Sequence, residues 1–94
     1  YIFSLDPTAK GAAAYSRFFN PDEGIREDPA TGTAAGPLVS HLVAHGVIED
    51  GSAAVIQQGV VMGRESLLRV EVSRGSVALS GSCFTTSEGV ILVE

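Results

Sequence analysis

The chain has 94 residues, of which 45% are hydrophobic and 18% charged, and its formal net charge is −5. A chain of this size and composition folds as one globular domain, so disorder and a second domain are both excluded. The acidic balance, with no cluster of Lys or Arg, argues against nucleic acid and anionic membranes as partners. No apolar run approaches the roughly 20 residues that a membrane helix needs.

The N-terminal part of the sequence predicts short strands joined by turns. Tyr1–Leu5 is typical of a strand, and it lacks the basic start and small-residue cleavage site of a secretory signal. The aromatic stretch Tyr15–Phe19 predicts a second strand. Asn20–Gly24 has turn chemistry, because its proline presets φ and its glycine tolerates a positive φ. Ile25–Ala30 is predicted to be a loop.

One helix is predicted from about Thr33 to His45. Its apolar residues recur with helical spacing and form one stripe, made of Leu38, Val39, Leu42 and Val43. Thr33 is a suitable N-cap, because its hydroxyl can accept a bond from a free backbone N–H of the first turn. Gly46 is a suitable C′ residue, where a left-handed backbone ends many helices.

After the helix the chain is predicted to be all-β. The expected strands are separated by glycines, and they are Ala53–Gln58, Ser66–Val72, Ser76–Ser80 and Gly89–Glu94. Leu68, Val70 and Val72 alternate and should share one buried face. One helix with several antiparallel strands is an α+β fold, in which antiparallel β structure surrounds a central helix.

The strongest candidate site is the stretch from Asp28 to Thr33. A helix N-terminus carries about half a positive charge and several free N–H donors, so it attracts carboxylates or phosphates. Gly32 and Thr33 offer such donors and a hydroxyl, and Asp28 adds a carboxylate suited to proton transfer on an anionic substrate. The alternative is an ordinary loop with a capping threonine and a solvated aspartate.

Three further features are open to simpler interpretations. His41 and His45 share a helical face, but no third ligand accompanies them, so they are interpreted as polar positions and no metal is expected. Gln57–Arg64 is either a strand and turn or a segment that borders a cleft. Cys83, the only cysteine, excludes an internal disulfide, fits a reducing compartment, and is expected to be a buried small residue within a β run.

Several of these motifs, taken in order, resemble the PhzF-like phenazine-biosynthesis family. They are Phe18-Phe19-Asn20-Pro21 with Gly24-Ile25, Glu27-Asp28-Pro29-Ala30-Thr31-Gly32-Thr33-Ala34, and Gln58-Gly59 with Met62-Gly63-Arg64. The resemblance implies a diaminopimelate-epimerase-like fold, in which two similar domains enclose the active site between them. Residues 1–94 would be the C-terminal domain, with the N-terminal domain absent, and the missing initiator methionine agrees with a piece of a longer protein.

The resemblance also implies a function. The best-known family members isomerise a dihydro-hydroxyanthranilate without a cofactor, using a glutamate of the first domain. The assisting catalytic aspartate falls on Asp28, and the substrate-binding pair falls on Gly32 and Thr33, where Thr33 replaces a commoner serine. The expected partners are a small carboxylic acid, the missing N-terminal domain and a second copy in a cytoplasmic homodimer, with no nucleic acid and no membrane.

Two other functions compete with this isomerase. A domain with the same fold could be non-catalytic and serve ligand binding or structure alone, if no partner domain supplies a glutamate opposite Asp28. A true amino-acid epimerase would carry a catalytic cysteine where this chain has Thr31. A threonine hydroxyl is not ionised near neutral pH, which argues against two-cysteine epimerase chemistry.

Overall fold

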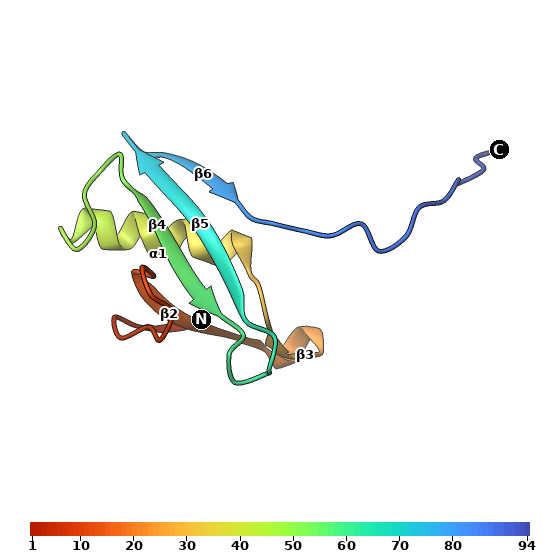
Figure 1. The fold of residues 1–94 in the computed structure, drawn as a ribbon, viewed down its shortest axis with the longest axis horizontal. Helices are drawn as coiled ribbons and strands as arrows, with labels where there is room; N and C mark the ends of the chain where they lie inside the picture. Colours follow the sequence, from red (N-terminus) through yellow and green to blue (C-terminus); the bar gives the residue numbers. More distant parts are fainter.

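Six strands form one sheet that lies against a single helix (Figure 1). The computed structural model describes residues 1–94. The strand order is β1-β2-β4-β5-β6, and β3 pairs with β2 away from this path. In chain order the elements are β1 (Ile2–Ser4), β2 (Ala14–Asn20), a 3-10 turn (Pro21–Glu23), β3 (Ile25–Asp28), α1 (Gly32–Ala44), β4 (Ala53–Gln58), β5 (Ser66–Ser73) and β6 (Ser76–Ser80). The α+β prediction is confirmed.

The sheet is mixed, whereas the sequence predicted antiparallel pairing throughout. β2 and β4 run parallel, with Ala14 opposite Ile56 and Ser16 opposite Gln58. Two parallel strands need a long crossover between them, and this crossover contains β3 and α1. The other strand pairs are antiparallel. The crossover carries the chain from β2 through the candidate site and back to β4.

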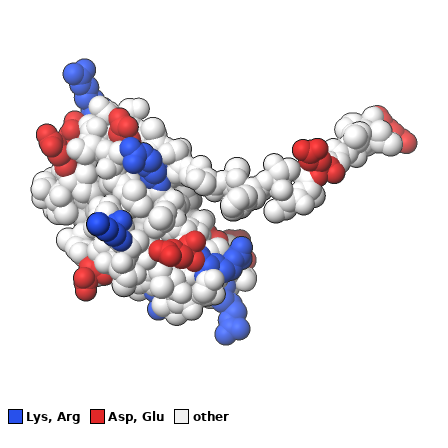
Figure 2. All heavy atoms as spheres, in the orientation of Figure 1, with Lys and Arg blue, Asp and Glu red and all other residues white.

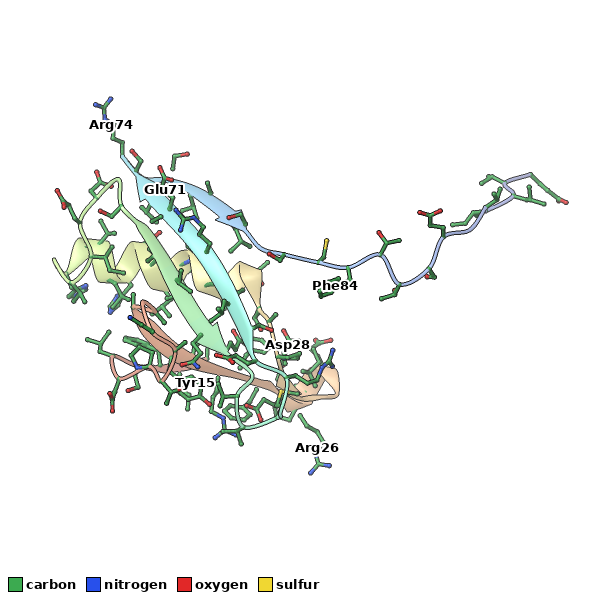
Figure 3. All side chains as sticks on the ribbon, viewed as in Figure 1. Tyr15, Arg26, Asp28, Glu71, Arg74 and Phe84 are labelled. Carbon is green, nitrogen blue, oxygen red and sulfur yellow. The ribbon has the colours of Figure 1, made fainter.

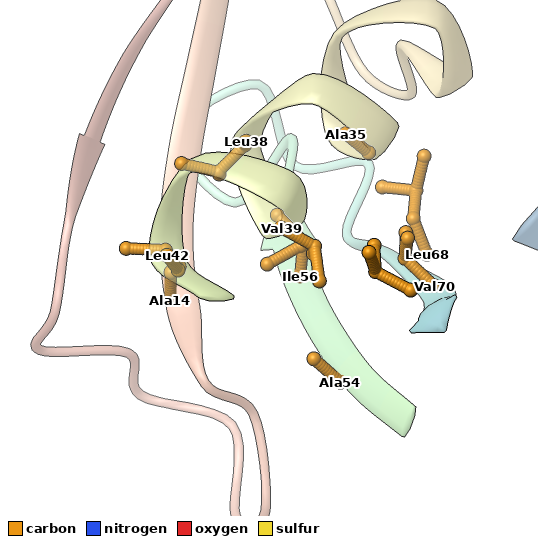
Figure 4. Packing of buried hydrophobic residues seen from close by; sticks show 10 residues of the cluster. Ala14, Ala35, Leu38, Val39, Leu42, Ala54, Ile56, Leu68 and Val70 are labelled. Carbon is orange, nitrogen blue, oxygen red and sulfur yellow. The ribbon is translucent and has the colours of Figure 1, made fainter. Parts of the chain in front are cut away.

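The apolar stripe of α1 packs on the sheet as predicted (Figure 4). Leu38, Val39 and Leu42 are at most 5% exposed, and Val43 packs against the edge of the same cluster. The sheet contributes the alternating residues of β4 and β5, which are Ala54, Ile56, Leu68, Val70 and Val72. Each buried aliphatic side chain of this kind contributes about 1.5–3 kcal/mol to folding.

The helix begins at Gly32, one residue earlier than predicted, and its N-cap lies two residues earlier. Thr31, not Thr33, is the N-cap, and its carbonyl accepts the N–H groups of Ala34 and Ala35 at 3.2 and 3.0 Å. At the other end Gly46 has a φ of +71°, as expected of a C′ residue. The N–H groups of Gly46 and Val47 return to Val43 and Leu42, which is the Schellman pattern.

Three other expectations are wrong. Ile25–Asp28 is a strand rather than a loop, because it pairs with β2 through Phe18 opposite Asp28. Gly89–Glu94 forms no strand, because no neighbouring strand pairs with it, and it belongs to an extended C-terminal segment, residues 81–94 (Figure 1). Cys83 lies exposed in that segment rather than buried in a β run.

The apolar residues near the chain end are solvent-exposed. Phe84 and Val90–Val93 are 88–92% exposed, and the space-filling view shows the segment as a thin arm that extends away from the folded body (Figure 2). On the folded body, blue and red side chains are interspersed in this view (Figure 2). No helix of the structure has the length and apolarity that crossing a membrane requires.

Candidate functional site

Asp28 and Thr31 form the centre of the candidate site. Asp28 ends β3, and Thr31 stands at the first turn of α1, so the short loop between them sets their spacing. The Thr31 hydroxyl donates to Oδ2 of Asp28 at 2.5 Å. This bond explains why Thr31 makes no side-chain bond to the helix N-terminus although it occupies the cap position. Asp28 is half-buried, and Figure 3 shows it at the end of the molecule where α1 begins.

Gln58 joins this loop to the sheet. It ends β4 and is 0% exposed, on the same strand face as the core residue Ile56. Its Nε2 donates to the carbonyl oxygen of Asp28 at 2.7 Å and to Oγ1 of Thr31 at 3.0 Å. Burial of an amide is tolerated when its donors find partners, and both donors of Nε2 do so here. The loop between β3 and α1 is therefore fixed to β4.

The glycine after Gln58 turns the chain away from the sheet. Gly59 has a φ of +81°, a backbone conformation that other residues rarely adopt. Its carbonyl accepts the Arg64 N–H at 3.0 Å, which closes the turn between β4 and β5. The sequence left Gln57–Arg64 open between a plain turn and a segment that borders a cleft. The structure places its Gln58 against the candidate site and its Arg64 at the exposed end of the turn.

The first turn of α1 opens onto a cleft of about 600 Å³. Ala30 and Gly32 line it from the helix side, Leu79 and Ser80 line it from β6, and Glu65 lines it from the turn before β5. The N–H groups of the first helical residues have no partner within the helix. A cleft beside such donors can accept a carboxylate or another small anion.

The three residues singled out in the sequence lie in different surroundings. Asp28 and Gly32 belong to one loop, joined through Thr31, and Gly32 lines the cleft. A Cβ on Gly32 would meet Cδ2 of Leu79, so the Leu79 side chain would have to move to admit one. Thr33 is exposed, makes no side-chain hydrogen bond and is not among the residues that line the cleft.

Glu27, the residue before Asp28, forms an ion pair with Arg17 of β2. The Arg17 guanidinium hydrogen-bonds to Glu27 and holds the pKa of that carboxyl below its ordinary value. The same bond raises the pKa of Arg17. Arg17 is thereby paired with Glu27, and the hydrogen bond that Asp28 accepts comes from a neutral hydroxyl.

His41 and His45 are adjacent on the exposed face of α1. Their ring centroids lie 4.2 Å apart, and Nδ1 of His45 lies 2.9 Å from the carbonyl oxygen of His41. No third histidine, cysteine or carboxylate joins them to make a metal-binding group. Their position fits polar residues on the side of the helix away from the core.

Sequence reasoning missed the structural roles of Thr31 and Gln58. Thr31 was considered only as the replacement of an epimerase cysteine, and Gln58 only as part of a motif. A hydroxyl three residues after an aspartate was a usable signal for the first, because such short spacings favour local side-chain bonds. No signal in the sequence relates Gln58 to Asp28, because parallel pairing of β2 and β4 brings them together.

Comparison with known proteins identifies relatives over most of the chain. The family model described as phenazine biosynthesis-like protein matches residues 2–89. A trans-2,3-dihydro-3-hydroxyanthranilate isomerase from Pseudomonas fluorescens is 43% identical over 83 residues, covering 83% of this chain and 30% of the relative. An uncharacterized isomerase, YddE, from Salmonella typhimurium is 45% identical over 60 residues, covering 61% of this chain and 20% of that protein.

A solved structure shares the fold. A predicted epimerase from Pseudomonas aeruginosa superposes with a TM-score of 0.61 at 35% sequence identity, covering 78% of this chain and 28% of that protein. The arrangement is that of the diaminopimelate-epimerase-like fold expected from the resemblance. The chain spans less than a third of the length of these relatives. The matched residues and the shared fold together establish that the chain belongs to the phenazine biosynthesis-like, or PhzC-PhzF, protein family.

Proposed function

We propose that this chain is the C-terminal domain of a cofactor-independent isomerase that transfers a proton on a small carboxylic acid. One observation carries the proposal: a half-buried carboxylate, Asp28, lies on the loop that leads into a helix N-terminus beside a 600 Å³ cleft. The helix N-terminus suits the carboxylate of the substrate, and Asp28 suits its mobile proton. The relatives named as isomerases support the same reaction class.

We propose that the reaction also uses a second domain. An isomerisation needs a group that removes a proton and a group that returns it, and Asp28 is proposed for one of these roles. We propose that a glutamate of an N-terminal domain removes the proton and that Asp28 assists. The substrate would lie between the domains, with its carboxylate at Gly32 and Thr33. The whole protein would act in the cytoplasm as a homodimer.

Turnover in deuterated water tests the role of Asp28. The full-length protein is incubated with trans-2,3-dihydro-3-hydroxyanthranilate, and deuterium entering the product is followed by mass spectrometry. Asp28→Asn keeps the shape but removes basicity, so kcat should fall by about 10²–10⁴-fold. Asp22→Asn is the matched control, because Asp22 is exposed on the 3-10 turn. Unchanged kcat in Asp28→Asn would favour the non-catalytic domain.

Substrate binding is tested at Thr33. Thr33→Val removes the hydroxyl and keeps the shape, so the loss should appear mainly in KM. The expected cost is roughly 1–3 kcal/mol, the usual penalty when a buried polar partner is left unsatisfied. Because Thr33 is exposed in this chain, the effect requires that the substrate and the second domain cover it. An unchanged KM would remove Thr33 from the site while leaving Asp28 in place.

A further inference from the structure

We infer that Gln58 is a positioning residue for Asp28, a role that rests on the proposed isomerase function and deepens it. Gln58 does not reach the cleft itself. It is fully buried at the end of β4 and is not among the residues that line the cleft. It acts on the reacting group through the Asp28 backbone and through the Thr31 hydroxyl.

The orientation of the Gln58 amide follows from its partners. One neighbour is the carbonyl oxygen of Asp28, 2.7 Å away, which can only accept a hydrogen bond. The nitrogen must therefore face it, since the amide oxygen in that place would set two acceptors against each other. The opposite end agrees, because Ser16 Oγ lies 3.4 Å from Oε1 of Gln58.

This orientation fixes the direction of the Thr31 hydroxyl. The second hydrogen on Nε2 of Gln58 points at Oγ1 of Thr31, 3.0 Å away, so that oxygen accepts. The single hydroxyl hydrogen of Thr31 is then free for Oδ2 of Asp28. The hydrogen bonds therefore run in one direction, from Gln58 to Thr31 and from Thr31 to the accepting carboxylate of Asp28. They hold one carboxylate oxygen of Asp28 and leave Oδ1 with no hydrogen bond from the chain.

The neighbouring glutamine provides a matched control. Gln57 is also buried, at 2% exposure, but its side chain lies on the opposite face of β4. Its Oε1 accepts the N–H groups of Thr8 and Ala9, and its Nε2 donates to Thr8 and Glu65. Replacing either glutamine by methionine removes a buried amide of the same size from the same strand. Only the change at Gln58 disconnects the loop that carries Asp28.

The test is a double-mutant cycle on kcat in the full-length protein. Gln58→Met should lower kcat by about 10²-fold, as small misplacements of reacting groups do, with a smaller change in KM. Thr31→Val should do the same, and Thr31→Ser should restore the wild-type rate. In the Thr31→Val background, Gln58→Met should have little further effect, because both act through one chain of bonds. Gln57→Met should lower kcat far less than Gln58→Met, because Gln57 makes no bond to the Asp28 loop.

Additive effects in the cycle would overturn the inference, and so would equal losses of kcat in Gln57→Met and Gln58→Met. If Gln58→Met fails to fold, the inference is tested by comparing Thr31→Ser with Thr31→Val. Equal kcat values in these two variants would overturn the inference.

A second readout separates this inference from the proposed function. Amide hydrogen exchange is measured by NMR on the full-length protein, at Ala34 and Ala35, whose N–H groups bond to the Thr31 carbonyl. Protection should fall in Gln58→Met and persist in Gln57→Met. If the Asp28→Asn variant turns over at the normal rate, the proposed function fails. A loss of protection at Ala34 and Ala35 in Gln58→Met, but not in Gln57→Met, would still support positioning of the loop by Gln58. Equal protection in both glutamine variants overturns the inference.

Discussion

Gly59 and Pro29 lie in backbone contact, so the turn after β4 and the loop before α1 support each other. A Cβ on Gly59 would stand 3.0 Å from the carbonyl oxygen of Pro29 and closer still to that of Arg64. Gly59→Ala should therefore destabilise the fold by about 1–3 kcal/mol, combining a positive φ with the clash. Urea unfolding measures the loss.

Gly63 is the control for this substitution. It has a φ of +68° in the same turn, but a Cβ there would meet nothing within 4 Å. Gly63→Ala should therefore cost only the backbone strain, and the difference between the variants reports the clash of the Gly59 Cβ with the carbonyl oxygens of Arg64 and Pro29. Equal losses would mean that this clash contributes nothing.

Leu42 should be one of the most sensitive positions of the core. It is 2% exposed and packs between α1 and the sheet (Figure 4). Leu42→Ala should reduce the free energy of unfolding by about 2–5 kcal/mol, because it removes buried apolar atoms and leaves a cavity. Val47→Ala, at a residue that is 51% exposed, is the comparison and should cost far less. Similar losses from the two variants would contradict this packing.

The Arg17–Glu27 ion pair should make stability depend on pH at the acidic end. The guanidinium lowers the pKa of Glu27 in the folded chain. The pair therefore stabilises the fold above the unfolded pKa of about 4.3, and this contribution is lost as the pH falls through the lowered folded value. The urea concentration at the midpoint of unfolding should fall between pH 7 and pH 3, and it should fall further in the wild type than in Glu27→Gln. Equal differences would show that the ion pair has no effect on stability.

The 94-residue chain alone should be inactive and should self-associate. It lacks the second domain that the proposed reaction needs, and its C-terminal segment exposes Val90–Val93 almost completely. Exposed apolar patches of this kind drive association in water. Sedimentation equilibrium should show association that disappears when residues 81–94 are removed. Turnover of trans-2,3-dihydro-3-hydroxyanthranilate by the fragment would contradict the need for a second domain.

Periodic features of the sequence predicted most of the fold. The stripe of α1, the alternation in β5 and the bounds of β4 and β6 follow from spacing within each segment. β3 was missed because it is rich in charge and becomes a strand only by pairing with β2. Gly89–Glu94 has strand composition but no partner strand in the structure. Local patterns report propensity, whereas pairing depends on segments far apart in the chain.

The candidate site, like the fold, could be predicted from the sequence only where its residues are close together in the chain. Asp28 and the helix N-terminus could be predicted, because they are close in sequence and their chemistry is local. The cap was placed on Thr33 because either threonine could serve, and the bond from Thr31 to Asp28 was not considered. Gln58 reaches the site only through the register of β2 and β4.

That register has a consequence for folding kinetics. Ala14 meets Ile56 only after the intervening β3 and α1 have been made, so the central strand pair is a long-range contact. Closing a long segment costs chain entropy before any contact compensates for it, which slows folding. During synthesis the residues of α1 leave the ribosome before β4 and β5 exist to cover Leu38 and Leu42. The apolar face of the helix therefore stays open to solvent until the second half of the chain has left the ribosome.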